Sequence, residues 1–477
     1  TRQLNPTVDV PGRPRLLAIG SHSDRMTIKP AMKDAFFAPA RLCLFALGVL
    51  LFVLPTTAFA QSNGNGSIYS RFGLGELKTL ASPQAQALGG GGVGLRSLNY
   101  TSLSNPALWS DQVLTRFVLG GNYHETNARD ARGTQSELVA GTLNAVQFSF
   151  PIYTRKLGFS VGYHPYSLMN YRVVRRPETP FQFGPAPTDT TAYTVDYEGR
   201  GGIQQISGGL GWRISNALSV GASVDALFGI LEEARETTLG PGFAPINFTD
   251  ATRLSGFTGT FGALLTVADL FADDDALSLG GSLMLPASLD GRRVRTLGES
   301  LSRDTIGTVV DGSVDLPWRA QGGLTYKPNN SFTITADGLY APWSTAESTF
   351  DGASEGPSQF PIGGSAFLTD RWRVSGGVEY LPAGNDPSAS YFGRAAYRLG
   401  GYYEQTYAAP VAGESIDVRA ATAGLSLPTR LSGTRLDLDV EVGVRGTTSR
   451  NLVRDIFYGV SVNVNIGERW FQERKLR

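Results

Sequence analysis

The sequence is poor in cysteine and histidine, and each shortage excludes a class of site. Cys43 is the only cysteine, and the three histidines are His22, His124 and His164, in a chain of 477 residues. Without further cysteines there is no disulfide framework, and a thiolate metal site or a cysteine nucleophile has little to draw on. A zinc or iron centre would also lack nitrogen donors. We therefore expect no cofactor and no bound metal.

The chain also has no excess of charge of either sign. Its 42 basic residues balance its 42 acidic residues, whereas a nucleic-acid binder needs a basic surplus to neutralise phosphates. Glycine is abundant, with 58 residues, and aromatic residues make up 10% of the chain. This composition favours a β-rich protein with many turns, and nucleic acid is not an expected partner.

The first 60 residues are predicted to be absent from the folded protein. Residues 1–31 have no hydrophobic period and are interpreted as an upstream extension from a wrongly placed start, not as part of the native protein. Residues 32–60 have the layout of a signal peptide, with basic residues before the apolar run Leu42–Leu54 and small residues in Ala58-Phe59-Ala60. Cleavage is expected before Gln61, which would also remove the single cysteine. A membrane anchor is the alternative, but the apolar run is short for the roughly 20 residues that a spanning helix needs.

The last strand before the C-terminus indicates a membrane β-barrel. In the segment 456–466 apolar residues alternate with small or polar ones, which gives one wholly apolar face. Trp470 and Phe471 follow, and then a basic tail over residues 472–477 that we place in the periplasm. Barrel-assembly machinery recognises an amphipathic C-terminal strand that ends in aromatic residues, and aromatic rings suit the bilayer interface. The residues assigned to this assembly signal are Tyr458, Val460, Val462, Val464, Ile466, Trp470 and Phe471.

The same alternation recurs along the chain and predicts a fold. It is found at Val146–Phe150, Leu218–Val224, Leu277–Leu285, Phe332–Tyr340, Arg371–Tyr380 and Arg435–Arg445. About fifteen candidate strands lie between Leu114 and Ile466, and removing the weakest, Phe360–Leu368, leaves about fourteen, an even number as bacterial barrels require. We therefore predict an all-β, transmembrane antiparallel β-barrel over residues 110–471. A soluble β-sandwich or propeller is the alternative, with the apolar face inside.

The predicted strand register also assigns the loops. Short links at Thr154–Lys156, Ser215-Asn216 and Lys327–Asn330 are expected on the periplasmic side. Long outer loops are expected at 126–142, 173–191 and 234–250, with another at Thr345–Asp370.

Residues 61–109 do not show this strand pattern and are predicted to form an N-terminal hatch inside the lumen. Gly89, Gly91 and Gly94 match the dinucleotide fingerprint G-x-G-x-x-G, but no strand–turn–helix context surrounds them, so we reject a nucleotide site. The glycines instead suit a backbone packed in a confined space where side chains would not fit.

The order of these motifs resembles the FadL-type family of long-chain fatty-acid and hydrocarbon transporters. The resemblance rests on the glycine-rich run Leu88–Leu95, on Asn105-Pro106-Ala107 after it, and on the strands that follow. It implies a hatch folded inside a barrel of about fourteen strands, and passive uptake of hydrophobic molecules from outside into the outer membrane through a lateral opening. Neither ligand-contacting residues nor a strand kink that would form such an opening can be identified from the sequence.

The resemblance also suggests site residues. Arg71, Phe72, Asn105, Pro106 and Ala107 are the hatch and ligand candidates, with Arg71 as a possible partner for a carboxylate. An ion pair between Arg71 and an acid of the lumen wall is the competing interpretation. The acids available are Asp437, Asp439 and Glu441, and Arg435 beside them also predicts an ion network within the wall.

Two other functions remain open. One is a non-transporting structural or secretion-accessory barrel, which a lumen sealed by charge pairs would favour, whereas an apolar tunnel past the hatch would favour transport. The other is an enzyme, which is disfavoured because His164, with Ser160 on the same strand, lacks a nucleophile motif. The expected location is the outer membrane. The expected partners are its lipids, the barrel-assembly machinery and a hydrophobic small-molecule ligand, and the barrel is expected to be a monomer.

Overall fold

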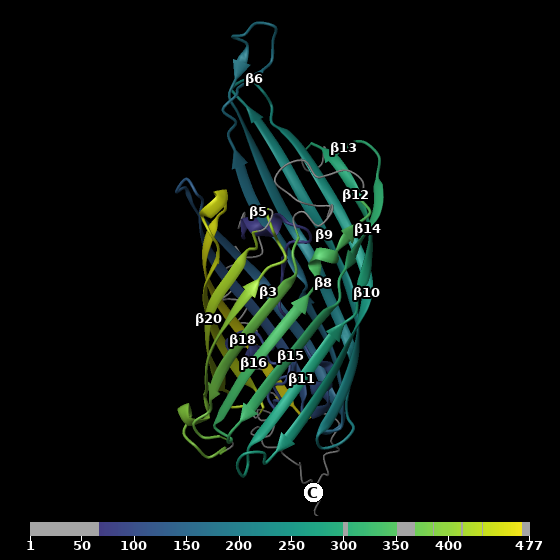
Figure 1. Ribbon diagram of the computed structural model, residues 1–477, viewed down its shortest axis with the longest axis vertical. Helices are drawn as coiled ribbons and strands as arrows, with labels where there is room; N and C mark the ends of the chain where they lie inside the picture. The colour runs from purple at the N-terminus through teal and green to yellow at the C-terminus, as the bar shows by residue number, and fades with distance from the viewer. Residues whose placement is uncertain are drawn as a thin grey trace, which may run out of the picture. The chain divides into compact units, whose positions relative to one another are not determined.

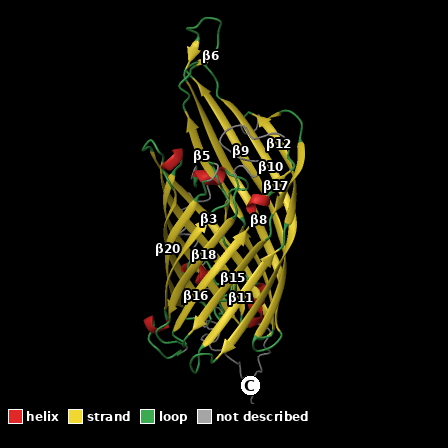
Figure 2. Cartoon of the chain, viewed as in Figure 1, coloured by secondary structure: helices red, strands yellow, loops and turns green. Residues whose placement is uncertain are grey.

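The described residues form a closed antiparallel β-barrel of 14 strands that surrounds an N-terminal hatch (Figures 1 and 2). The computed structural model describes residues 66–298, 304–350, 368–384, 386–411, 414–431 and 433–469. The predicted leader, the upstream extension, the basic tail, Trp470 and Phe471 lie outside these residues. Among the residues described, no helix is long and apolar enough to cross a membrane.

The wall begins at Thr115, and its last strand pairs with its first. The ladder between β2 and β22 runs from Thr115↔Glu468 to Arg129↔Arg454 and closes the barrel. The wall segments are β2 (Thr115–Arg129), β3 (Gln135–Tyr153), β4 (Leu157–Pro165), β5 (Ser167–Arg175), β8 (Tyr193–Arg213), β9 (Leu218–Leu239), β10 (Ile246–Ala268), β11 (Ala276–Met284), β12 (Ala287–Leu297), β14 (Val310–Leu316), β15 (Arg319–Lys327), β16 (Phe332–Ala341), β18 (Arg371–Tyr380), β19 (Ala396–Gln405), β20 (Asp417–Pro428), β21 (Arg435–Gly446) and β22 (Arg454–Glu468).

Three wall strands are each interrupted once, and a proline lies at every interruption. Pro165 ends β4 before β5, Pro286 separates β11 from β12, and Pro317 separates β14 from β15. Proline has no N–H to donate to a ladder, so it is tolerated in a sheet only at an edge, a strand end or an irregularity. Both halves of an interrupted strand pair with the same neighbour or with successive parts of it; β4 and β5, for example, both pair with β8.

Short elements complete the chain. The hatch, which we define as residues 66–114, contains η2 (Ile68–Arg71), β1 (Glu76–Leu77), α2 (Pro83–Ala87) and η3 (Pro106–Asp111). Elsewhere lie β6 (Phe181–Gln182), β7 (Thr190–Thr191), β13 (Asp304–Thr305), η5 (Trp343–Thr345), β17 (Glu347–Ser348), η7 (Phe392–Arg394) and η8 (Ser449–Asn451).

The wall has an apolar exterior and a polar interior, which distinguishes it from a soluble sandwich. On the outside Phe257 is 74% exposed and Leu399 66% exposed, whereas Asp437 inside is fully buried. The final strand follows the predicted alternation, with Tyr458 and Val460 outside and Asn463 inside. This inversion is typical of a barrel whose outer face meets lipid.

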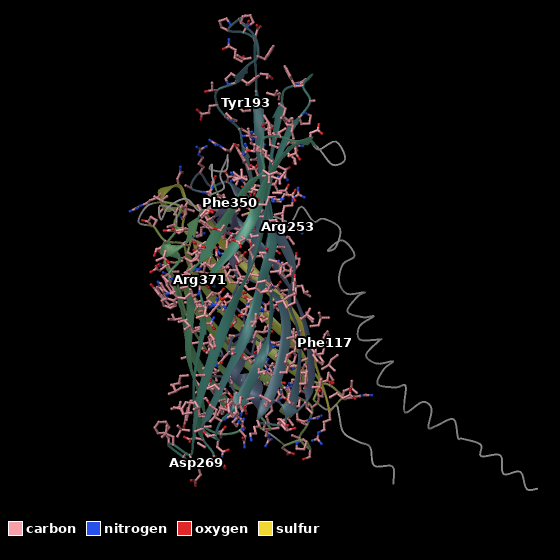
Figure 3. The ribbon with its side chains drawn as sticks, turned by 90° about the vertical axis from the view of Figure 1, so that its right-hand side faces the viewer. Phe117, Tyr193, Arg253, Asp269, Phe350 and Arg371 are labelled. Atoms are coloured by element: carbon pink, nitrogen blue, oxygen red, sulfur yellow. The ribbon has the colours of Figure 1, made fainter. Side chains whose placement is uncertain are left out.

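The strands on one side of the barrel are far longer than the others. We call the end with the short links the lower rim and the opposite end the upper rim; in Figure 3 Asp269 marks the lower rim, and Tyr193 lies high at the upper end. β8, β9 and β10 contain 21, 22 and 23 residues, whereas β16 contains 10. At about 3.3 Å per residue, β9 is some 40 Å longer than β16, so the upper part of these three strands rises above the other strands of the barrel (Figure 1).

These long strands correct the predicted loops. Residues 126–129 belong to β2 and residues 135–142 to β3, and the predicted loop 234–250 is mostly the ends of β9 and β10. Polar residues on an extended strand above the apolar band look like loop residues in the sequence, because both face water. The predicted loop Thr345–Asp370 contains β17, and residues 351–367 within it lie outside the described part.

An apolar cluster lines the inner face of the tall side. Leu227, Leu231, Leu254, Leu289 and Val314 are all nearly or fully buried, and Trp343 packs in the same cluster. Leu74 and Leu77 of the hatch join it. The upper lumen on this side is therefore filled by protein, and the hatch is fixed there by the burial of apolar surface.

Candidate functional site

The glycine-rich run of the hatch passes so close to the barrel wall that side chains would not fit between them. A Cβ on Gly280 of β11 would come within 2.2 Å of the Val93 carbonyl oxygen, and one on Gly377 of β18 within 2.8 Å of Leu88 Cα. Gly89 has φ +88°, where other residues are strained. The packing agrees with the interpretation of this run as confined backbone.

Hydrogen bonds from the wall hold the backbone of the same run. Asp337 Oδ1 accepts from the Val93 amide at 2.9 Å, Arg373 Nη2 donates to the Gly89 carbonyl at 2.7 Å, and Thr422 donates to the Ala87 carbonyl at 2.9 Å. The groups come from β16, β18 and β20, so the hatch is fixed by contacts from several strands rather than from one.

A buried ion network lies between the hatch and the wall. Arg398 donates to Glu379 at 2.7 Å, to Asp437 at 2.9 Å and to the Tyr100 hydroxyl at 2.9 Å. Gln84 of the hatch also donates to Glu379. Burial raises the pKa of the Tyr100 phenol, which keeps it a donor to Asp437. Buried charges persist only when they are paired and hydrogen-bonded, so each group of this network depends on the others to remain buried.

The ion network differs from the predicted one in its partners. Asp437 is paired with Arg398, whereas Arg435 donates to Ser426 and to the Arg394 carbonyl. Arg435 is close to the acids in sequence. Arg398 lies on β19 and points into the lumen, and the strand register of β19, β20 and β21 brings it to Asp437.

A second ion cluster ties β1 to the opposite wall. Glu76 accepts from Arg445 Nη2 at 3.0 Å and from Lys78 at 2.9 Å. Burial alone would raise the pKa of the Glu76 carboxyl, but the charges of Arg445 and Lys78 outweigh it and hold that pKa well below its usual range. The carboxylate therefore remains ionised, and the cluster intact, under all ordinary conditions.

Asn105, Pro106 and Ala107 form an anchor for the end of the hatch. Asn105 is fully buried, and its side-chain oxygen caps η3 by accepting from the Ala107 amide at 3.0 Å. Its Nδ2 donates to the carbonyls of Val93 at 2.8 Å and of Ala263 at 3.1 Å. The motif thus joins the glycine-rich run to β10, and its role in binding a ligand remains a prediction.

Arg71 and Phe72 lie on the other side of the hatch. Phe72 is 1% exposed and packs with Tyr69, Ile416 and Leu452. The Arg71 guanidinium stacks over the Phe72 ring at 4.8 Å from its centroid. Neither residue lines the cavity described below, so their predicted contact with a ligand also remains untested.

Ser160 and His164, the residues considered for a serine hydrolase, do not bond to each other. Ser160 bonds to Gln147 at 3.0 Å, while His164 Nε2 lies 3.5 Å from the Ser207 hydroxyl.

The barrel wall is open between β3 and β5. The ladder between β3 and β4 stops at Val146↔Tyr163, and β5 then pairs with β8 rather than with β3. The free edge of β5 is met at its base by the hatch, where Glu76↔Leu168 and Leu77↔Ser167 are paired. Above this point the upper part of β3, residues 135–145, and the upper part of β5 lack ladder partners on their facing edges among the described residues. We call this opening the lateral gap.

The bend of the third wall strand creates the gap. Pro165 ends β4, and on β8, beside the start of β5, Gly201 and Gly202 have φ +103° and +134°. A Cβ on Gly202 would come within 2.3 Å of the Ser167 carbonyl oxygen, so glycine is needed where β5 turns inward. Sequence reasoning missed this kink, although Tyr163–Tyr166 (YHPY) places a proline inside a strand pattern, which is a signal for an edge or a break.

A cavity of about 390 Å³ lies behind the lateral gap. Both free edges line it, through residues such as Leu138 and Thr142 of β3 and Leu168 and Asn170 of β5. Its charged lining residues are Glu76, Lys78, Glu198, Arg200, Arg371, Arg373, Glu404, Asp439, Glu441 and Arg445, and His124 also lines it.

The charges of the cavity are unevenly paired. Arg371 and Arg373 share the single carboxylate Glu404, at 2.8 and 2.9 Å. On β21, Asp439 accepts from Asn463 and Glu441 from the Tyr402 hydroxyl, and neither forms an ion pair with a described residue. The cavity therefore has a cationic side at β18 and an acidic side at β21. Such a cavity suits a ligand that carries a polar or charged group.

Comparison with known proteins agrees with this architecture. The sequence profile of the BamG family matches residues 45–477. The chain belongs to the BamG family. No curated protein matches it.

Solved structures similar to this BamG family member share its fold. A FadL homologue from Pseudomonas aeruginosa is 13% identical with a TM-score of 0.52, and the alignment covers 83% of this chain and 100% of the homologue. The toluene transporter TbuX from Ralstonia pickettii is 15% identical with a TM-score of 0.50, over 82% of this chain and 99% of TbuX. The predicted resemblance to FadL-type proteins is thus confirmed for the barrel fold with its hatch.

Proposed function

We propose that this barrel lies in a bacterial outer membrane and takes up small hydrophobic or amphipathic molecules passively through the lateral gap. The observation that carries the proposal is the unpaired stretch between β3 and β5, with a cavity directly behind it. A molecule that enters the cavity from the upper rim could leave sideways into lipid. The hatch would not have to move, because this route passes above the ion network around Arg398.

The names of proteins with the same fold support this proposal. TbuX is described as a toluene transporter, and the Pseudomonas aeruginosa protein as a FadL homologue.

Long-chain fatty acids are the ligand we propose first. The guanidinium groups of Arg371 and Arg373 share one acid, so a surplus positive charge is available for a carboxylate. The apolar side chains of Leu138 and Leu168 at the gap would contact the hydrocarbon tail. We expect the protein to act as a monomer, surrounded by outer-membrane lipids and inserted by the barrel-assembly machinery, and not as an enzyme.

Uptake measurements test this function. Labelled oleate and labelled toluene would be offered separately to proteoliposomes that contain the refolded barrel and to cells that lack the gene. We expect oleate to enter proteoliposomes faster than protein-free vesicles. A correctly folded barrel that passes neither compound would refute the proposal.

A non-transporting accessory barrel is the second candidate, and one observation favours it. The buried network around Arg398 places charge pairs between the hatch and the wall, the kind of contact that a sealed lumen would need. If neither compound is taken up, the tall upper part of β8, β9 and β10 would be the surface to test for a partner protein.

A further inference from the structure

Four cationic side chains surround one carboxylate at the lower rim, in a half-open cavity of about 280 Å³ that is separate from the one behind the lateral gap. Two segments of the hatch and three ends of wall strands meet there. The hatch contributes Arg96 and Asp111, and the wall contributes Arg155 from the β3–β4 turn, Arg213 from the end of β8 and Lys327 from the end of β15. Ser97 and Leu98 complete the lining.

Both carboxylate oxygens of the one acid in this lower cavity are hydrogen-bonded to two of the four cations. Asp111, 3% exposed, accepts from Arg96 Nε at 2.7 Å and Nη2 at 2.8 Å, and also from Arg213 Nη2. Lys327 Nζ donates to the Arg96 carbonyl oxygen at 2.7 Å, which is not a charged partner. Arg155 forms no ion pair with any described residue. Four positive charges against one negative charge leave a net charge of +3 on the lining.

This excess of positive charge is more than the fold requires. One arginine would neutralise Asp111, and cations gathered without acids repel one another. Glu379 acts electrostatically on Lys327, but its carboxylate is already bonded to Arg398 at 2.7 Å. The cost of assembling these cations would be offset by an anion that takes the unused N–H donors.

We propose that the lower cavity binds a phosphoryl oxyanion. Nη1 of Arg96, the remaining N–H groups of Arg213 and Lys327, and the whole guanidinium of Arg155 are donors left over by the contacts above. A tetrahedral oxyanion presents several acceptor oxygens to such a set, and arginine forks match phosphate geometry. At a barrel rim the group comes either from a phospholipid headgroup or from a free phosphate compound.

Titration of the full barrel in a phosphorus-free detergent tests this site, with inorganic phosphate as the probe in a calorimeter. The Arg155→Gln variant should weaken phosphate binding roughly tenfold, the loss expected for one charge-assisted contact. Arg155 is exposed in a turn, so its replacement should not disturb folding. Arg430→Gln, an exposed arginine of the β20–β21 link at the same rim, is the matched control and should bind like the wild type.

A second measurement separates the two sources. Native mass spectrometry of the barrel with added phosphatidylglycerol counts the retained lipid molecules for the wild type, Arg155→Gln and Arg430→Gln. Phosphate binding that depends on Arg155 assigns the site to free phosphate compounds. Lipid retention that depends on Arg155, without phosphate binding, assigns it to a headgroup. If both signals are absent, or are the same in Arg155→Gln as in the wild type, the proposal is wrong, whatever the uptake experiments show.

Discussion

The hatch contacts the barrel wall in two different ways, one in the lower lumen and one at the lateral gap. In the lower lumen, backbone lies directly on backbone, and buried groups such as Arg398 and Asp437 are paired. At the gap the hatch meets β5 through the two residue pairs of β1 and through the Ser70 hydroxyl, which accepts from the Asn170 amide at 3.0 Å, and a cavity remains beside them. The comparison shows that the lower part of the hatch is held firmly by the wall. The strand edges beside the lateral gap have the fewest partners.

Replacement of Arg398 should have the largest effect on the stability of the contact between hatch and wall. Arg398→Leu would leave Glu379 and Asp437 buried without their cation, which we expect to cost about 3–5 kcal/mol of stability. Unfolding in urea, followed by heat-modifiable gel mobility, measures the loss. Arg430→Leu on the exposed rim is the control. A stability equal to that of the wild type would show that the network does not fix the hatch.

A methyl group between wall and hatch should have the next largest effect. Gly280→Ala would press on the Val93 carbonyl, and overpacking of this kind costs about 1–3 kcal/mol. Gly322→Ala is the matched control, because nothing lies within 4 Å of a Cβ there. The same unfolding assay compares the two variants. Equal midpoints would mean that the hatch is loosely held at this point.

The gap, in contrast, should respond in function rather than in stability. Leu138→Trp would place an indole in the cavity behind the gap, and we expect oleate uptake to fall toward the level of protein-free vesicles. Val139→Trp, the adjacent residue, which does not line the cavity, should leave uptake unchanged. Equal uptake by both variants would argue against the lateral route.

The smallest effect should come from acidification between pH 7 and pH 5. The pKa of Glu76 is lowered in the folded state, so its contribution is present above the unfolded pKa near 4.3 and is lost only as the pH falls through the lower folded value. The extra cleavage of the hatch in Glu76→Gln, relative to the wild type, should therefore be the same at both pH values. Limited proteolysis of the two proteins at each pH measures this difference. A difference that shrinks at pH 5 would contradict this account.

The sequence predicts the wall better than it predicts the site. Alternation in β22 places Tyr458 outside and Asn463 inside because strand periodicity is a local property. Crowding of glycine in Leu88–Leu95 likewise indicates backbone packed in a narrow space.

Features that depend on strands distant in sequence were not predictable in the same way. The pairing of Asp437 with Arg398 requires the register of β19 through β21, and no spacing along the chain encodes it. The gap depends on Pro165, which pairs with Gln204 of β8 at the end of β4, and on Gly201 and Gly202 a few residues earlier on β8, where β5 begins. Each residue is visible in the sequence, but their coincidence exists only in the folded sheet.

The closing ladder between β2 and β22 has a consequence for the order of folding. It joins residues more than 300 positions apart, from Thr115↔Glu468 onward. Contacts of such high sequence separation form late because the loop entropy must be lost first. The hatch precedes β2 in the chain, yet its contacts reach Ser461 and Asn465 on β22. The hatch is thus made before the wall but is among the last parts to reach its final place, and its contacts with β22 can form only when the ring of strands has closed.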